Sequence, residues 1–494
     1  MVNRSAGAGR QPVVVGAAGV VQHCDSSLDS TLDAAGLMAA ACVAAAGHHA
    51  EQLLPQVGLV AVPRGTWKYS DAGRLVARAI GAERSSTLVS EVGILQSDTL
   101  IAGIQAVAEG RVESAVVIGG EALDRRRQAR KANMRALETV QVGEVPDVVQ
   151  AAPSPFVGNE EESWGIREPY LQYVLVDSAR RHRLGIEMTA HRQAIARRYE
   201  QLSRVAVANP AAWERSLWSA DELLDTSRPG NRMLAYPYSV KTVTQMYLDQ
   251  AAALLICTEA EAKRLGVPED RWVYPEVGVG CSHVVPLANR ADPSRNDQWV
   301  LMSEAVEKAA GRPVASYDLL DLYNCFPVAL DLQCDAFGIS ADRVPSVTGG
   351  MSFGGGGFNH AAIQAFARAV ELIQEGAGSN AFVTANSGYL TKQGAVSFAR
   401  DRPQSPFQAL DLTPRAGIAV RRRSSVLQYS GPAEIEGVTV LFERNEPARA
   451  FALVRTGDGE GTIVSSTEDN VLAAFLESDW VGQSLRVDRG RARL

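Results

Sequence analysis

The stretch IAGIQAVAEGRVESAVVIGGE (residues 101–121) shares its order of features with FARAVELIQEGAGSNAFVTANSG (residues 366–388). Each is an amphipathic helical pattern that ends in Glu-Gly, followed by a short polar turn, a β-branched or aromatic strand and small residues. A glycine-bearing approach precedes each stretch, at Gly93 and at Gly354 to Gly357. The pair predicts two similar halves, although two ordinary βα units also resemble each other by chance.

Strand and helix signals alternate around this pair. PVVVGAAGVV (residues 12–21) is rich in valine, LDAAGLMAAACVAAAG (residues 32–47) is helical, and QVGLVAV (residues 56–62) is a short strand. Alternation of this kind predicts an α/β fold in which helices cover both faces of a sheet.

The composition changes between the two stretches and again after them. Residues 125–238 are rich in Arg, Glu, Pro and Trp, and one long helical pattern, residues 170–207, ends before Asn209-Pro210. We therefore expect an insertion (loop) domain at 125–238. The first half then comprises 1–124 and 239–260, and the second half 261–405.

Residues 406–494 begin with a Pro-bearing linker and then alternate apolar and polar residues, with turn signals at Asn-Glu-Pro and Gly-Asp-Gly. This pattern predicts a separate small β-barrel that starts near residue 421. Its core is expected to combine Phe475 and Trp480 with Val438, Val440, Phe442, Phe451, Leu453 and Ile463.

Charge and cysteine usage narrow the protein class. The 494 residues carry a net charge of -7, which disfavours a nucleic-acid partner, and the basic run at residues 125–131 is interpreted as a solvated helix face. No segment has the apolar length of a membrane span, and the N-terminus lacks a signal-peptide pattern. The six cysteines lie far apart without metal-ligand spacing, so we expect a cytoplasmic protein with no metal site.

Five segments, taken in order, resemble the thiolases. They are RRYEQLSRVAVANPAAW (197–213), YPYSVKTVTQMYLDQAAALLI (236–256), DLLDLYNCFPVALDL (318–332), TGGMSFGGGGFNHA (348–361) and VTANSGYL (383–390). Within that superfamily the sequence is most similar to the sterol-carrier-protein type and to actinobacterial thiolase-like proteins, over roughly residues 12–420. The resemblance implies two βαβαβαββ halves with an insertion domain, to which the OB-like barrel is added.

The resemblance also implies where catalytic residues would stand. Thiolases use a nucleophilic cysteine at a helix N-terminus, a histidine that activates it, a second cysteine as acid or base, and a residue that holds a water molecule. In this sequence those four positions are occupied, in the same order, by Gly93, Gly356, Asn386 and Tyr323. Asn324 stands where the family has an acidic residue beside the water-holding one. Glycine offers no nucleophile and an amide is no acid or base near neutral pH. Conventional thiolase activity is therefore not expected, although the class by resemblance is acyltransferase.

Other side chains remain candidates, each with an ordinary alternative. Cys325 is either a thiol near the pocket or a buried small hydrophobe, and His360 either serves the site or faces solvent. Tyr323 is a core residue or an acid or base, with Tyr389 as a second such tyrosine. Ser387 is adjacent to the position of the second cysteine, and no histidine aligns to activate it.

The resemblance names CoA or an acyl-CoA as the ligand, with nothing bound covalently. Arg125, Arg126 and Arg130 are candidates for the CoA phosphates, because the CoA site of the family lies against the insertion domain. The run of Gly354, Gly355 and Gly356 either forms a tight turn or leaves backbone N–H groups free to approach a thioester or phosphate.

Three functions remain open at this point. The first is an acyl-CoA-binding protein without thiolase activity, and the second is a retro-aldol lyase on an acyl-CoA, as in steroid side-chain breakdown. The third is a scaffold that binds a protein partner through its C-terminal domain. Thiolases dimerise through the strand that corresponds to SSTLVSEV (85–92), and Glu91 in that strand makes a monomer as well as a homodimer consistent with the sequence.

Overall fold

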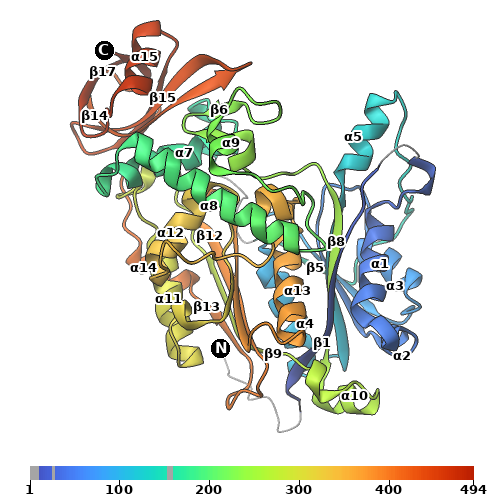
Figure 1. Ribbon diagram of the computed structural model, residues 1–494. Helices are drawn as coiled ribbons and strands as arrows, with labels where there is room; N and C mark the ends of the chain where they lie inside the picture. The colour runs from blue at the N-terminus through green and yellow to red at the C-terminus, as the bar shows by residue number, and fades with distance from the viewer. Residues whose placement is uncertain (1–9, 25–27, 153–158) are drawn as a thin grey trace.

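Two mixed sheets lie on either side of a central pair of helices in the computed structural model, which describes residues 10–24, 28–152 and 159–494 (Figure 1). The central helices are α4 (Gln96–Ala108) and α13 (Ala361–Gln374). Their apolar residues pack against strands of both sheets in one buried cluster. The outer faces are covered by α1 (Ala34–Ala46) and α3 (Ala72–Ala79) on one side and by α11 (Asp297–Ala310) and α12 (Pro327–Phe337) on the other.

The first sheet has the order β1-β8-β4-β2-β3-β5 and the second has the order β10-β11-β12-β9-β13. The strands of the first are β1 (Pro12–Val21), β8 (Asp249–Thr258), β4 (Ser114–Ala122), β2 (Leu59–Pro63), β3 (Ser86–Ser90) and β5 (Val148–Gln150). Those of the second are β10 (Leu319–Asp321), β11 (Asn380–Ser387), β12 (Lys392–Ala399), β9 (Tyr274–Ser282) and β13 (Gln408–Asp411).

The strand pairings repeat between the halves. β1 is antiparallel to β8, β8 is antiparallel to β4, and β4 is parallel to β2. The same pattern joins β9 to β12, β12 to β11, and β11 to β10. The two quoted sequence stretches become the equivalent pairs α4–β4 and α13–β11, so the predicted α/β fold of two similar halves is confirmed.

The region between the halves departs from the single long helix that the sequence pattern predicted. The structure has α7 (Pro169–Arg183) and α8 (Met188–Ala208), which are separated at Gly185 with a φ of 64°. A glycine accepts this left-handed conformation, which ends one helix and lets the next begin in a new direction. β5 also comes from this region and joins the first sheet, while the domain boundaries themselves remain predictions.

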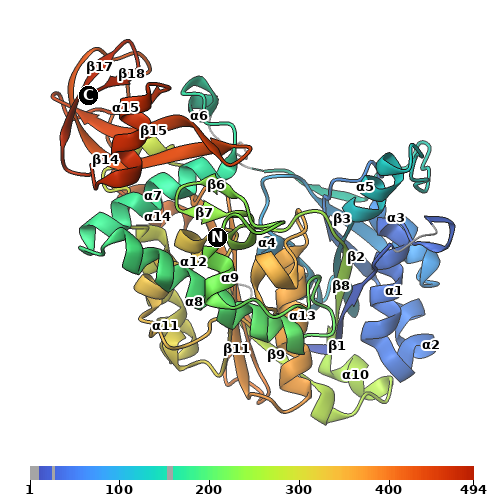
Figure 2. The ribbon, with the colours of Figure 1, turned by 45° about the horizontal axis from the view of Figure 1, so that its top comes forward.

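A closed ring of five strands forms the C-terminal barrel, as predicted. In ring order the strands are β14 (Gly431–Glu443), β15 (Glu446–Thr456), β16 (Gly461–Ser466), β18 (Arg491–Arg493) and β17 (Ser484–Asp488). The barrel lies against α7, as Figure 2 shows, and Val438 N donates to Ser178 Oγ on that helix (3.0 Å). β6 (Met233–Ala235) pairs with β14 beside it.

The expected barrel core is only partly right. Val438, Val440 and Phe475 share a core, with Phe442 and Trp480 packed against it. Phe451, Leu453 and Ile463 instead belong to the large cluster of the second half and the inserted helices. The cause is strand alternation: Ala450, Ala452 and Val454 of β15 face the barrel interior, and the residues between them face the main body.

Candidate functional site

An apolar cavity of about 210 Å³ lies where the two halves meet the inserted helix α7. Six parts of the chain line it: the start of α4, residues 244–246 before β8, residues 323–326 before α12, residues 351–359 of the glycine-rich loop, the end of β11 with the turn after it, and α7. The cavity brings together Tyr323, Cys325, Gly356, Asn386, Ser387 and Tyr389. Residues that the resemblance placed at catalytic positions therefore meet in one place.

The nucleophile position, Gly93, lies one residue before the segment that lines this cavity. Gly93 adopts a φ of 101°, and the residues that follow it, Ile94 to Gln96, line the cavity. The carbonyl oxygen of Gly93 accepts a hydrogen bond from Lys392 Nζ (2.9 Å), although Lys392 is wholly buried. Burial lowers the pKa of Lys392, against the opposing effect of Asp98. Sequence reasoning missed this lysine, whose one signal is a cation in a strand that has no other charged residue.

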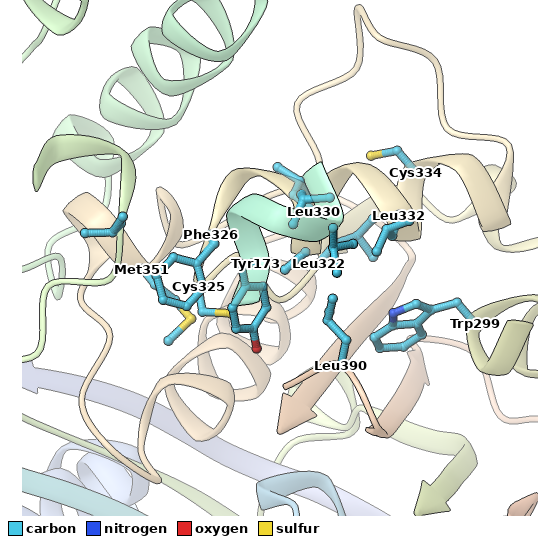
Figure 3. Close-up of a cluster of buried hydrophobic side chains, with 14 of the residues drawn as sticks. Tyr173, Trp299, Leu322, Cys325, Phe326, Leu330, Leu332, Cys334, Met351 and Leu390 are labelled. Atoms are coloured by element: carbon cyan, nitrogen blue, oxygen red, sulfur yellow. The ribbon is translucent and has the colours of Figure 1, made fainter. Parts of the chain in front are cut away.

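The cavity also contains a small polar cluster in an otherwise apolar setting. Tyr173 of α7 lies beside Cys325 and Phe326 (Figure 3), and its ring centroid is 4.2 Å from that of Phe326. Asn386 Nδ2 donates to the Tyr173 hydroxyl (3.3 Å). The other amide atom, Asn386 Oδ1, is buried and has no hydrogen-bond partner among the described residues. Tyr173 was not predicted, because nothing in the sequence says which face of α7 meets the site.

Cys325 is buried in this cluster, as expected if it is a small buried hydrophobic residue. Burial raises the pKa of Cys325 to about 12, and hydrogen bonding to Tyr173 opposes the shift only weakly. A helix does start two residues later, at Pro327, whereas no helix N-terminus was expected at this cysteine. Proline has no N–H at that first helical position, so part of the usual stabilisation of a thiolate is missing.

Tyr323 and Asn324 differ in what their side chains do. Tyr323 lines the cavity, and burial raises the pKa of its hydroxyl well above its ordinary value. Asn324 is turned away into the protein, where its Oδ1 accepts from Met351 N (2.6 Å) and its Nδ2 donates to Leu322 O (3.1 Å). Asn324 therefore holds the glycine-rich loop and does not face the cavity.

The glycine run is a tightly packed turn. Gly355 N donates to Gly350 O (3.3 Å) and Gly356 N donates to Gln245 O (3.0 Å), so these two amides are not free for a ligand as one interpretation had expected. A Cβ on Gly354 would lie 2.6 Å from Thr348 O, and one on Gly355 would lie 2.1 Å from Gln250 Oε1. Of the three predicted glycines only Gly356 lines the cavity.

His360 is wholly buried, so the solvent-facing interpretation is wrong. It precedes α13 and lies behind the cavity wall, outside the residues that line it. Burial lowers the pKa of His360 to about 4, with weaker opposing contributions from Gly119 and Gln364. The imidazole is therefore neutral in the folded protein near pH 7.

None of the three candidate arginines lines the cavity. Arg125 is buried and donates to Thr31 Oγ1 (2.8 Å) and Leu137 O (2.7 Å). Arg126 bonds to Thr66 and lies 3.6 Å from a Glu138 carboxylate oxygen. Arg130 is exposed and remains the candidate of this set for a CoA phosphate.

One group of potential metal ligands exists among the described residues. Single atoms of Cys24, Asp124 and Asp249 lie within 4.8 Å of one another. Cys24 Sγ donates to Asp249 Oδ2 (3.1 Å), and burial raises the pKa of the thiol to about 12. A protonated thiol bound to a carboxylate accounts for this contact without an ion.

Comparison with known proteins identifies the C-terminal domain. Residues 416–491 match the family model described as the thiolase-like protein type 1 additional C-terminal domain. No curated protein matches the chain significantly in sequence. Among the described residues, no helix is both long and apolar enough to cross a membrane.

Solved structures match between 80% and 100% of the chain. A monomeric SCP2-thiolase-like protein type 1 from Mycobacterium smegmatis has 24% identity and a TM-score of 0.81, with 100% of each chain covered. The Ltp2-ChsH2(DUF35) aldolase has 17% identity and a TM-score of 0.59, over 80% of this chain and 99% of that one. Human mitochondrial 3-ketoacyl-CoA thiolase in complex with CoA has 14% identity and a TM-score of 0.53, over 80% and 98%. The chain therefore has the fold of the thiolase superfamily, together with a barrel that matches the additional C-terminal domain of the type 1 thiolase-like proteins.

Proposed function

We propose that the cavity binds the acyl end of a CoA thioester and that the protein has no conventional thiolase activity. The observation that supports this most directly is Asn386 Oδ1, a buried oxygen at an apolar cavity that lacks a partner among the described residues. Buried polar atoms are almost always hydrogen-bonded, so a ligand that donates a hydrogen bond there would complete the site. A hydroxyl on the acyl chain or an amide N–H of the pantetheine arm is such a donor.

The lack of thiolase chemistry rests on the residues at the reacting positions. Gly93 has no side chain, and Asn386 stands where the second cysteine would be. Cys325 holds its proton far above neutral pH, so it lacks the thiolate that would form a thioester. Support from known proteins is the likeness in fold to a thiolase solved with CoA.

Calorimetric titration with CoA, acetyl-CoA and a medium-chain acyl-CoA tests the proposal. We expect the acyl-CoAs to bind more tightly than CoA, and Asn386→Leu to weaken them about 10-fold, the usual cost of losing one buried hydrogen bond. Asn380→Leu at the other end of β11 is the matched control and should bind normally, since Asn380 pairs with Asp318. Absence of acyl-CoA binding to the unaltered protein would refute the proposal.

A retro-aldol lyase is the second candidate, because two tyrosines line the same cavity. In such a reaction the β-hydroxyl loses its proton, the adjacent C–C bond breaks, and the resulting enolate takes up a proton. Tyr323 and Tyr389 would serve these proton transfers, and the two-component aldolase is similar to this chain in fold. Incubation with a branched β-hydroxyacyl-CoA should then release a shorter acyl-CoA and a ketone, and Tyr323→Phe should abolish that release.

The scaffold hypothesis predicts a protein partner and no binding of CoA compounds. A pull-down that recovers one fixed protein partner through the barrel, while no CoA compound binds in calorimetry, would favour it over both enzymatic and ligand-binding functions.

A further inference from the structure

An exposed surface that is both apolar and basic lies on α5 (Leu123–Lys131) and on residues 132–147, which form no regular helix or strand. Figure 1 shows α5 projecting beyond the first sheet. Large apolar side chains of the irregular segment have more than half of their surface exposed: Met134 53%, Leu137 78%, Val140 82%, Val142 86% and Val145 77%. Exposed apolar side chains gathered in this way are uncommon on a monomer and mark an interaction site.

Positive charges without an acidic partner accompany these apolar side chains. Arg127, Arg130 and Lys131 are exposed and share one face of α5, as residues i, i+3 and i+4. Arg135 is exposed in the segment that follows. Among the described residues, no carboxylate oxygen lies within 4.0 Å of the charged nitrogens of these four side chains. Arg127 instead lies over the ring of Tyr247, with its Cζ 5.5 Å from the ring centroid.

The carboxylates of the irregular segment are already paired with arginines of the same chain. A carboxylate oxygen of Glu138 lies 3.6 Å from Arg126 Nε. Glu144 and Asp147 are paired with arginines of α3, at 2.6 and 2.7 Å. The charge that remains free on this surface is therefore positive, although the whole chain carries a net charge of -7.

This combination of features selects one kind of occupant. A second copy in a two-fold contact would bring the same cations against one another. Lipid would leave the polar backbone of residues 132–147 without hydrogen-bond partners. Residues 123–150 contain no aromatic side chain on which nucleic-acid bases could stack. An acidic protein segment supplies carboxylates for the cations and hydrogen-bonding groups for the irregular backbone.

We propose that this surface binds a protein segment in which Asp or Glu residues lie beside aliphatic ones. We name it the α5 surface, and it comprises Arg127, Arg130, Lys131, Met134, Arg135 and Leu137. Its apolar and basic parts are held together because Arg125 Nη1 of α5 donates to Leu137 O (2.7 Å). Tyr247, which contacts Arg127, directly follows Met246 of the apolar cavity, so the partner would bind beside that cavity.

Fluorescence anisotropy of a labelled peptide in which glutamate and leucine alternate, titrated with the full chain, tests the α5 surface. This peptide should bind, oligoglutamate of equal length should bind more weakly, and a peptide of alternating lysine and leucine should not bind. Arg130→Glu and Leu137→Ser should each weaken the glutamate–leucine peptide about 5-fold. The matched controls are Lys308→Glu and Ile418→Ser, which change an exposed cation and an exposed apolar residue elsewhere and should bind normally.

Other outcomes would overturn the proposal. Absence of peptide binding would do so, and so would equal binding by the two surface variants and the two controls. Tighter binding of phosphatidylserine vesicles or duplex DNA than of the peptide, lost in Arg130→Glu, would assign the surface to a membrane or a nucleic acid instead. Displacement of the peptide by CoA would assign Arg130 to the proposed CoA site and exclude a separate docking surface.

The proposal does not rest on ligand binding in the apolar cavity. Peptide binding that responds to Arg130→Glu and Leu137→Ser would support the α5 surface even if no acyl-CoA binds, and that result would overturn only the proposed function.

Discussion

Burial keeps the thiol of Cys325 protonated, although the residue lies next to the cavity and two positions before α12. A pKa of about 12 against an ordinary value of 9.0 means a thiolate fraction about 1000-fold lower at pH 7. Proximity to a possible substrate is therefore not enough for covalent chemistry, since the reactive form of the side chain is missing.

The first prediction follows from that protonated thiol. Incubation with acetyl-CoA or acetoacetyl-CoA should leave the intact mass of the protein unchanged, and iodoacetamide should label Cys325 about 1000-fold more slowly than glutathione at pH 7. The urea-unfolded chain is the control and should react at the rate of an ordinary thiol. A stoichiometric acetyl adduct on Cys325 or Ser387 that turns over with CoA would show a rebuilt acyltransferase site.

His360 gives the second prediction, because its folded-state pKa of about 4 lies below the ordinary 6.5. The unfolded chain then binds the proton more readily, so stability from this residue is present above pH 6.5 and is lost as the pH falls toward 4. Between pH 7 and pH 5 the unfolding free energy should fall by about 2 kcal/mol on this account.

Urea unfolding of His360→Gln and His48→Gln at pH 7 and pH 5 measures that contribution. The loss of stability on acidification should shrink in His360→Gln and remain in His48→Gln, because His48 is exposed. An equal acid dependence in both variants would mean that His360 is charged, or solvated, in the folded protein.

Among the elements, α-helices and strands with regular patterns were predictable from the sequence, and short ones set by tertiary contacts were not. The repeated α4–β4 and α13–β11 units follow directly from their periodicity. β5 and β13 are short strands of ordinary composition. Each forms because it pairs with the edge strand of a sheet made by other segments, β5 with β3 and β13 with β9. The break at Gly185 was hidden because apolar spacing continues through it.

β5 has a specific effect on β3, the strand through which thiolases dimerise. Val148, Val149 and Gln150 pair with Leu88, Val89 and Ser90, so the outer edge of β3 is covered by the chain itself. Glu91 is bound by Arg64 (2.8 Å) next to this edge. Because this edge is covered, we expect the protein to be a monomer in solution.

The third prediction tests this covering strand. Val149→Pro should break the pairing with Val89, since proline lacks the N–H and disfavours a paired strand, and the exposed edge should promote self-association. Light scattering after size exclusion should show dimers in Val149→Pro and monomers in Val142→Pro, whose position lies outside any strand. A dimeric unaltered protein would contradict the expectation at once.

The whole molecule depends on contacts between parts that the sequence presents as separate. The barrel was recognisable from its alternation, yet the outward residues of β15 and β16 complete a core with the second half. The site was predictable as a set of substituted positions, whereas Tyr173 and Lys392 were not, because each reaches the site from a distant segment. Which faces meet across domains is a property of packing that local pattern does not encode.

The fourth prediction concerns the seam between barrel and α7. A Cβ on Gly437 would lie 2.4 Å from Leu175 O, so Gly437→Ala should destabilise the protein by about 1–3 kcal/mol through overpacking. Gly457→Ala is the control, because nothing lies within 4 Å of its Cβ position, and its effect should stay within about 0.5 kcal/mol. Thermal unfolding of both variants measures the difference, and equal melting temperatures would mean a loose seam.

α7 presents Tyr173 to the apolar cavity on one side and Ser178, bound to Val438 of the barrel, on the other. Binding of a ligand in the cavity and binding of a macromolecule at the barrel would be thermodynamically linked if each shifted α7. A macromolecule that binds the barrel and shifts α7 would change the affinity of the cavity for its ligand by some factor. The ligand would then change the affinity of the barrel for that macromolecule by the same factor. Ligand binding in the cavity would then change the affinity of the barrel for its partner, even if the protein catalyses no reaction.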